Sequence, residues 1–258
     1  MGIEARCEAW VTPPEALEDT VSRLRAAETL GANVTVPHKE AVITLLDAVD
    51  PAAAAISAVN CIVNHAGRLT GHNTDMYGFL RSLREAGFEP HGCQALVLGA
   101  GGAARAVVFA LAKAGAEGVV VSGRTAAKAE ALAADLKRAL AGRSPINSCP
   151  WQGEAFVAAC RQADLIVNTT PMGTRHSEVA GDSPLETGLM RPGALVYDLV
   201  YNPPETPLLA RAKAAGARAV SGLDMLIYQG AESIRLWTGR EPPIDVMRAV
   251  AAKALAEG

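Results

Sequence analysis

Short apolar runs alternate with alanine-rich stretches from about residue 95 onward. Four runs rich in Val, Leu and Ile are bounded by Gly, Asn or Asp, at residues 95–99, 118–121, 164–168 and 194–200. Continuous apolar runs of this length are typical of strands that are buried on both faces of a parallel sheet. Each run therefore predicts one such strand.

Helices are predicted between these strands. Residues 103–114 have helical composition, and Gly115 follows them at the point where a helix would end. Residues 126–141 carry apolar side chains at helical spacing. The regular alternation of strand and helix predicts an α/β fold with a doubly wound parallel sheet and right-handed crossovers.

The rest of the chain has a different pattern. The elements predicted there are helices at residues 15–30, 38–49 and 242–256 and a strand pair at residues 58–64 and 68–71. Segment 84–92 contains Gly87, Pro90 and Gly92, so we expect it to connect two domains. A chain of 258 residues, half of them hydrophobic, is long enough for two modest domains with apolar cores.

Charge and cysteine content narrow the function classes. The net charge is −3 and no basic run is present, so we expect no nucleic acid and no membrane surface as partner. No apolar run reaches the roughly 18 residues of a membrane span. The five cysteines have no metal-type spacing, and the first residues do not form a targeting peptide. We therefore expect reduced thiols, no bound metal and a cytoplasmic location.

A glycine-rich segment lies directly after one predicted strand and directly before a predicted helix. Its residues are Gly99-Ala100-Gly101-Gly102-Ala103. Small residues permit a tight turn and close approach of the backbone to a pyrophosphate, which the N-terminus of the helix attracts. An ordinary turn is the alternative, but the strand before and the helix after favour a dinucleotide site.

The second predicted strand ends in Ser122-Gly123-Arg124-Thr125, where NAD-binding folds carry an acid for the ribose hydroxyls. No acid is present. Arg124 and the hydroxyl of Thr125 can bind a 2′-phosphate instead, and Lys128 follows one turn later. The sequence thus favours NADP(H) over NAD, although Arg124 and Lys128 could also be a solvated helix start.

Two polar clusters in the first part of the chain contain a lysine and an aspartate. Lys39 ends the segment Asn33-Val34-Thr35-Val36-Pro37-His38-Lys39, and Asp75 ends Gly71-His72-Asn73-Thr74-Asp75. Brought together, such a pair can interconvert a carbonyl and an alcohol, because the ammonium donates a proton as hydride reaches carbon while the carboxylate holds it in place. Taken singly, each residue is more often a solvated lysine or a turn aspartate.

Further motifs follow in a fixed order. They are Ala58-Val59-Asn60, Asn168-Thr169-Thr170-Pro171-Met172-Gly173, Tyr197-Asp198 and Gly222-Leu223-Asp224-Met225-Leu226-Ile227-Tyr228-Gln229-Gly230. Together with the clusters above, this series resembles the shikimate dehydrogenase family over essentially the whole chain. The resemblance implies an NADP-dependent oxidoreductase that reversibly reduces 3-dehydroshikimate to shikimate, the fourth step toward chorismate and the aromatic amino acids.

The resemblance also implies the domains and the site. Residues 76–221 would form an NADP-binding Rossmann domain, and residues 1–75 plus 222–258 a smaller substrate domain. Lys39 resembles the acid/base of the family and Asp75 its paired carboxylate. The implied substrate ligands are Thr35, Asn60, Gln229 and Asn33. The implied cofactor contacts are Gly99, Ala100, Gly101, Gly102, Ala103, Arg124, Thr125, Lys128, Val200 and Gly222, with Tyr201 also near the nicotinamide.

The chain departs from the family pattern in two places. Family members begin with a strand and a Ser-x-Ser loop that holds the substrate carboxylate. This chain begins at what resembles the second strand of that pattern. We therefore expect roughly 25–30 residues of the pattern to be absent. Gly123 stands where the family usually has Asn.

Two alternatives to an active shikimate dehydrogenase stay open. They are a catalytically impaired NADP-binding homologue and an enzyme that acts on quinate. We expect a monomer or homodimer with a small-molecule substrate.

Overall fold

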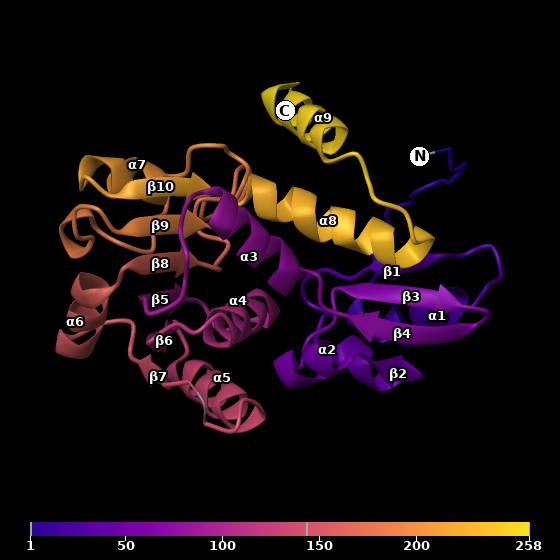
Figure 1. Cartoon of the computed structure of the whole chain (residues 1–258), viewed down its shortest axis with the longest axis horizontal. Helices are drawn as coiled ribbons and strands as arrows, with labels where there is room; N and C mark the ends of the chain where they lie inside the picture. The colour runs from indigo at the N-terminus through magenta and orange to yellow at the C-terminus, as the bar shows by residue number, and fades with distance from the viewer. Residues whose placement is uncertain (1, 143, 258) are drawn as a thin grey trace.

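Two β-sheets form the cores of two domains, and helices connect and cover them (Figure 1). The computed structural model describes residues 2–142 and 144–257. The larger sheet has six parallel strands in the order β10-β9-β8-β5-β6-β7, and the smaller sheet has four strands in the order β1-β3-β4-β2.

The strands are β1 (Gly31–Asn33), β2 (Ala48–Val49), β3 (Cys61–His65), β4 (Arg68–His72), β5 (Gln94–Leu98), β6 (Gly118–Ser122), β7 (Ile146–Cys149), β8 (Leu165–Asn168), β9 (Leu195–Asp198) and β10 (Arg218–Ser221). The α-helices are α1 (Leu17–Arg23), α2 (Pro51–Ile56), α3 (Asp75–Glu85), α4 (Gly102–Lys113), α5 (Ala126–Ala139), α6 (Glu154–Gln162), α7 (Pro207–Ala214), α8 (Leu223–Thr238) and α9 (Ile244–Glu257). Short 3₁₀ segments are η1 (Pro14–Ala16), η2 (Ala41–Leu45) and η3 (Thr187–Leu189).

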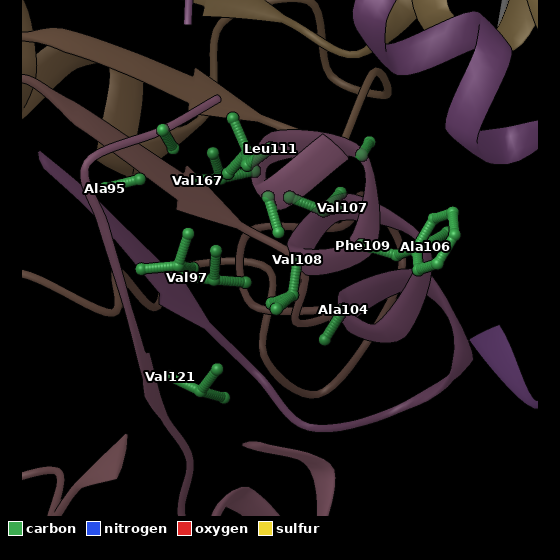
Figure 2. Packing of buried hydrophobic residues seen from close by; sticks show 14 of the residues in the cluster. Ala95, Val97, Ala104, Ala106, Val107, Val108, Phe109, Leu111, Val121 and Val167 are labelled. Carbon is green, nitrogen blue, oxygen red and sulfur yellow. The ribbon is translucent and has the colours of Figure 1, made fainter. Parts of the chain in front are cut away.

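The six-stranded sheet is apolar on both faces. Along β5, Val97 belongs to the cluster under α4 and α5, whereas its neighbour Leu96 belongs to the cluster under α6 and α7. Figure 2 shows Val97, Val121 and Val167, from three adjacent strands, beside the helix that carries Val108. Because helices cover both faces, the inner strands β5, β6, β8 and β9 have the continuous apolar sequences from which they were predicted.

The order of the strands reverses between β5 and β8. From β5 the chain passes through α4, β6 and α5 to β7 at one edge, then returns to β8 on the other side of β5 and continues to β9 and β10. All neighbouring strands of this sheet pair in parallel. The predicted doubly wound α/β fold is therefore confirmed. In such sheets, ligands bind at the carboxyl ends of the strands where the order reverses.

The prediction of one helix over residues 15–30 is wrong. The structure has η1 and a short α1 that ends at Arg23. Beyond it, the side-chain amide of Asn64 in β3 donates hydrogen bonds to the carbonyl oxygens of Ala26 and Thr29, each 2.9 Å long. The Ala26 carbonyl also accepts from the Thr29 N–H at 3.0 Å, which is a turn and not a helical hydrogen bond. The chain after Arg23 is therefore held as turns against β3 and does not continue the helix.

The prediction of a helix over residues 38–49 is also wrong. Residues 41–45 form the 3₁₀ segment η2, and β2 follows as a parallel neighbour of β4. Asp47 is tied to β4 twice: its backbone N–H donates to the Leu69 carbonyl at 3.0 Å, and its Oδ2 accepts from the Leu69 N–H at 2.7 Å. The β-branched residues at 42–44 weaken a helix here, and pairing with the sheet replaces it.

Helices α3 and α8 lie side by side between the two sheets (Figure 1). A Cβ atom on Gly78 of α3 would lie 2.7 Å from the Met225 carbonyl oxygen and 2.8 Å from the Gln229 nitrogen of α8. The two backbones can approach this closely because residue 78 has no side chain. The approach brings the start of α3, with Asp75, next to Gln229.

Candidate active site

Lys39 and Asp75 form an ion pair in the smaller domain. The Lys39 Nζ donates to Asp75 Oδ2 at 2.6 Å, and the side chains are only 16% and 8% exposed. Asp75 is the first residue of α3, where the helix dipole favours a carboxylate. Water screens such a pair less than it screens a surface pair, so the geometry of the lysine is held more firmly.

Asn60 connects the ion pair to α8. Its Nδ2 lies 2.9 Å from Asp75 Oδ1, 2.9 Å from Thr74 Oγ1 and 3.3 Å from Gln229 Oε1. Its Oδ1 accepts from the Thr74 backbone N–H at 2.6 Å. Asn60 is buried, so its amide fixes the side chains of Asp75 and Gln229 relative to each other.

A second layer of hydrogen bonds supports Asn60. The hydroxyl of Ser233 accepts from Asn33 Nδ2 at 2.8 Å and lies 3.2 Å from the hydroxyl of Thr74. Asn33 Nδ2 also donates to the Asn60 carbonyl at 3.2 Å. Thr74 and Ser233 were not predicted as site residues. One signal was available for Ser233: it follows Gln229 by four residues in α8 and so shares its face.

Thr35 has a different environment from these residues. Its side chain is exposed, and its hydroxyl makes one long hydrogen bond of 3.4 Å, to the Val36 carbonyl. A ligand could replace this weak bond at little cost. Thr35 therefore lies outside the hydrogen-bond network that joins the exposed Asn33, the buried Asn60 and the partly buried Gln229.

The glycine-rich loop follows β5 at the point where the strand order reverses. Gly99 has φ 118°, and a Cβ there would lie 2.2 Å from Thr169 Oγ1 in the loop after β8, so residue 99 must be glycine. A Cβ on Gly101 would meet nothing within 4 Å. Helix α4 begins at Gly102, and its first N–H groups have no partner within the helix. An open loop at the positive end of a helix fits a pyrophosphate.

The basic residues after β6 are also placed for a phosphate. Arg124, Thr125 and Lys128 are exposed, and neither cation forms an ion pair with any part of the chain that the structure describes. A Cβ on the preceding Gly123 would lie 3.4 Å from Ala100 Cβ, so this turn packs against the glycine-rich loop. The donors of Arg124 are thus available next to the predicted pyrophosphate position.

The loop also reaches the ion pair. A Cβ on Gly102 would lie 3.3 Å from Lys39 Cβ and 3.4 Å from Lys39 Cδ. The start of α4 in one domain therefore touches the lysine of the other.

Comparison with known proteins agrees with this arrangement. Three family models match: the shikimate dehydrogenase substrate binding domain over residues 1–62, shikimate / quinate 5-dehydrogenase over residues 83–177, and the shikimate 5'-dehydrogenase C-terminal domain over residues 222–252. A shikimate dehydrogenase (NADP(+)) of Moorella thermoacetica is 51% identical over 249 residues, which cover 96% of this chain and 82% of the relative. The chain belongs to the shikimate dehydrogenase family.

Solved structures of the family have the same fold. Shikimate 5-dehydrogenase from Thermus thermophilus, in complex with NADP(H) and shikimate, is 42% identical with a TM-score of 0.86, and the match covers 98% of this chain and 89% of that one. Quinate dehydrogenase from Corynebacterium glutamicum, in complex with NAD, is 34% identical with a TM-score of 0.82. The match covers 93% of this chain and 83% of that one. Structures of this shape therefore occur with NADP(H) and shikimate in one relative and with NAD in another, which is named a quinate dehydrogenase.

In this member of the family, the segment after β9 is held from two sides. The Val200 N–H donates to Asp198 Oδ1 at 3.1 Å, and the Val200 carbonyl accepts from the Gly222 N–H at 3.4 Å. A Cβ on Gly222 would lie 2.2 Å from the Leu199 carbonyl oxygen, so glycine is needed there. The Val200 side chain is only 8% exposed, whereas the adjacent Tyr201 is 37% exposed. Of the two, Tyr201 has the more accessible side chain.

Asp198 anchors this segment and was not among the predicted site residues. It is fully buried and accepts from Asn168 Nδ2 at 2.8 Å and from Thr206 Oγ1 at 2.6 Å, in addition to the Val200 N–H. Burial raises the pKa of Asp198 to about 6, although the three donors oppose the rise. The residue joins the ends of β8 and β9 to the start of α7.

Proposed function

We propose that this chain catalyses the reversible, NADPH-dependent reduction of 3-dehydroshikimate to shikimate. The observation that carries the proposal is the ion pair of Lys39 and Asp75, which stands against the first turn of α4 where the glycine-rich loop ends. A proton donor and a dinucleotide loop are thereby adjacent. The 51% identical relative is named for this activity, and the Thermus thermophilus structure was obtained with both ligands.

The cofactor would lie across the carboxyl ends of β5 and β8. The proposed contacts to the pyrophosphate are the backbone of Gly99, Ala100, Gly101, Gly102 and Ala103. Arg124, Thr125 and Lys128 would bind the 2′-phosphate of NADP(H), for which a guanidinium supplies strong charge-assisted bonds. Gly222 and the backbone of Val200, with Tyr201, would border the nicotinamide, which supplies hydride to the substrate when the cofactor is bound.

Lys39 would act as the general acid. Its ammonium donates a proton to the ketone oxygen of 3-dehydroshikimate as hydride reaches the carbonyl carbon, so the product is an alcohol and the lysine is left neutral. In the reverse direction, the neutral amine removes the proton from the hydroxyl of shikimate. Asp75 holds the amine in place, because its Oδ2 is 2.6 Å from Nζ while its Oδ1 is fixed by Asn60.

The polyol ring would be recognised by hydrogen bonds. Thr35 and Gln229 are the proposed direct contacts, since the Thr35 hydroxyl is exposed and Gln229 is only partly buried. Asn60 and Asn33 were also predicted to bind the ring; Asn60 is buried, Asn33 is exposed, and the amide nitrogen of each donates to protein atoms. We propose that they also set the positions of the groups that touch the ring. A site that fills the hydrogen-bond positions of a ligand strongly rejects analogues that lack them.

Residues 1–75 and 222–258 would form the domain that binds the substrate. Residues 76–221 would form the domain that binds the cofactor. The strands support this division, since β1 to β4 lie in the first range and β5 to β10 in the second. Helices α3 and α8 lie at the boundaries and contribute Phe79, Leu83 and Met225 to the cluster beneath the larger sheet.

The proposed setting is the cytoplasm, with a monomer or homodimer acting on a small molecule and without nucleic acid or membrane. A net charge of −3 gives no attraction to nucleic acid or to an anionic membrane surface. Within residues 2–142 and 144–257, no helix is long and apolar enough to cross a bilayer. All five cysteines are free, as reduced thiols would be. Light scattering after gel filtration would give the oligomeric state.

The test of function follows the absorbance of NADPH with 3-dehydroshikimate as substrate. The reverse reaction is measured with NADP⁺ and either shikimate or quinate. We expect turnover in both directions, with kcat/KM for shikimate at least about tenfold higher than for quinate. Faster turnover of quinate would assign the chain to that substrate. Tight NADPH binding without turnover of any of the three would identify a catalytically impaired homologue.

A further inference from the structure

The contact between Gly102 and Lys39 places a constraint on both residues. Besides its distances of 3.3 and 3.4 Å to the lysine stem, a Cβ on Gly102 would lie 3.7 Å from Ala58 Cβ. Contacts of 3.0–3.4 Å are tighter than nine in ten real Cβ contacts, so a side chain here would require a shift of a few tenths of an ångström. The lysine stem occupies the space that this side chain would need.

The backbone does not explain why residue 102 is glycine. Gly102 is the first residue of α4, and its φ lies outside the left-handed region that favours glycine. Gly99 differs, because both its φ of 118° and its contact with Thr169 require glycine. At Gly101 a Cβ would face open space. The three glycines therefore lie in different surroundings. At Gly102, the side chain of Lys39 occupies the space that a side chain would need.

Lys39 is restrained at three points along its length. Its backbone carbonyl accepts from the Val59 N–H at 2.8 Å, its Nζ donates to Asp75 at 2.6 Å, and its stem packs against Gly102. A lysine side chain is flexible, and an acid must sit within hydrogen-bond reach of the atom that it protonates. The contact in the middle of the stem removes freedom that the two end contacts leave.

We propose that Gly102 is a positioning residue for Lys39. Because residue 102 has no side chain, the first turn of α4 rests directly on the lysine stem and keeps Nζ on Asp75. The same turn would receive the pyrophosphate, so one element aligns both the cofactor and the proton donor. The inference rests on the proposed function for the catalytic role of Lys39, but the contact itself can be tested without turnover.

The experiment compares wild type, Gly102→Ala and Gly101→Ala. The rate at which trinitrobenzenesulfonate modifies Lys39 is measured by peptide mass spectrometry, with the exposed Lys113 at the other end of α4 as internal standard. In Gly102→Ala, we expect Lys39 to be modified several-fold faster, because its amine is displaced from Asp75. In Gly101→Ala, we expect the wild-type rate of modification together with weaker NADPH binding.

Turnover gives a second readout. Gly102→Ala should lower kcat for 3-dehydroshikimate by roughly tenfold, since small displacements of catalytic groups are costly. The pH dependence of kcat, measured at saturating NADPH, should shift, whereas KM for the substrate should change less than about threefold. A merely structural loss would lower stability and raise KM for the substrate, and it would leave the pH dependence of kcat unchanged.

Unfolding measurements distinguish a lost contact with Lys39 from a general folding defect in the variant. Gly102→Ala should lower the melting temperature less in a Lys39→Gly background than in wild type, because Lys39→Gly removes both the Cβ and the Cδ that the new side chain would meet. Equal effects in both backgrounds, or unchanged modification of Lys39 together with unchanged kcat, would overturn the inference. A wild-type protein that fails to turn over 3-dehydroshikimate would refute the proposed function instead, and the modification and melting results would still decide the role of Gly102.

Discussion

Asn60 donates a hydrogen bond of 2.9 Å to Asp75 Oδ1, which leaves the other carboxylate oxygen to Lys39. The carboxylate is therefore held by donors on both sides, one neutral and one charged. Asn60 is in turn held by the Thr74 backbone. A rigid, partly desolvated carboxylate can fix a lysine that must transfer a proton without drifting into solvent.

The first prediction concerns the charge on Lys39. Lys39→Met keeps most of the stem that packs on Gly102 but has no proton to donate, and Lys39→Ala removes both. Both variants should lose about 10²- to 10⁴-fold in kcat, the usual contribution of a general acid. NADPH affinity, measured by fluorescence titration, should stay within a few-fold of wild type. Turnover in Lys39→Met near the wild-type rate would show that the stem matters and the ammonium does not.

The second prediction concerns Ser233, which holds Asn33 and Thr74. Ser233→Ala should reduce the free energy of unfolding by about 1 kcal/mol through the lost hydrogen bonds. It should also raise KM for 3-dehydroshikimate several-fold, because Asn60 and Gln229 become less fixed, with little change in NADPH affinity.

Ser82→Ala is the matched control for Ser233→Ala. Ser82 is likewise buried, but it bonds to the Tyr197 hydroxyl at 2.6 Å, in contact with the larger sheet. Its loss should cost similar stability and leave KM for 3-dehydroshikimate unchanged. Parallel increases in KM for both variants would mean that Ser233 acts only through general stability.

Ser233 also illustrates which parts of the site a sequence can reveal. The glycine-rich loop was predictable because its function depends on neighbours in the chain, a strand before it and a helix after it. The bond between Asn33 and Ser233 spans 200 residues, and no local pattern marks it. Gln229 was assigned through the family motif and not through its contacts.

The same reasoning explains the errors in secondary structure. The four inner strands of the larger sheet, β5, β6, β8 and β9, were predicted because burial on both faces leaves an apolar run that is visible in sequence. The edge strands β7 and β10 have mixed polar and apolar sequences and were not predicted. The helix expected at 15–30 has suitable spacing, but Asn64 binds the carbonyls that would have continued it. The helix expected at 38–49 is replaced by pairing of Asp47 with Leu69. In both cases, contacts that are distant in sequence outweighed local preference.

The third prediction concerns cofactor choice. Arg124→Ala should weaken NADPH binding by roughly ten- to a hundred-fold, which corresponds to one lost charge-assisted contact. Binding of NADH should hardly change, because NADH has no 2′-phosphate. Arg138→Ala removes the same charge from the last turn of α5, where Arg138 pairs with Asp135, and should leave both affinities unchanged. Equal weakening of NADPH and NADH in Arg124→Ala would contradict the assignment.

The last prediction concerns pH and Asp198. Burial raises the pKa of this carboxyl from its ordinary 3.8 to about 6. Between these two values the folded protein keeps the proton and the unfolded chain has released it. The contribution of Asp198 to stability should therefore be greatest below about pH 4 and should be lost as the pH rises toward about 6, by about 1.4 kcal/mol per unit.

Urea unfolding of wild type and Asp198→Asn between about pH 4 and pH 7 tests this, because the asparagine cannot titrate and other groups cancel in the difference. The free energy of unfolding of wild type should fall relative to the variant across that window. Thr206→Ser keeps the hydroxyl, which donates to Asp198 at 2.6 Å in the native protein, and should preserve the pH dependence of wild-type stability. Thr206→Val removes this donor from the carboxylate. The decrease in the free energy of unfolding should then extend to higher pH. A difference between wild type and Asp198→Asn that stays constant from pH 4 to 7 would show that the buried carboxyl does not titrate in this range. The segment that carries Val200 and Tyr201 would then be anchored by a carboxylate at all these pH values.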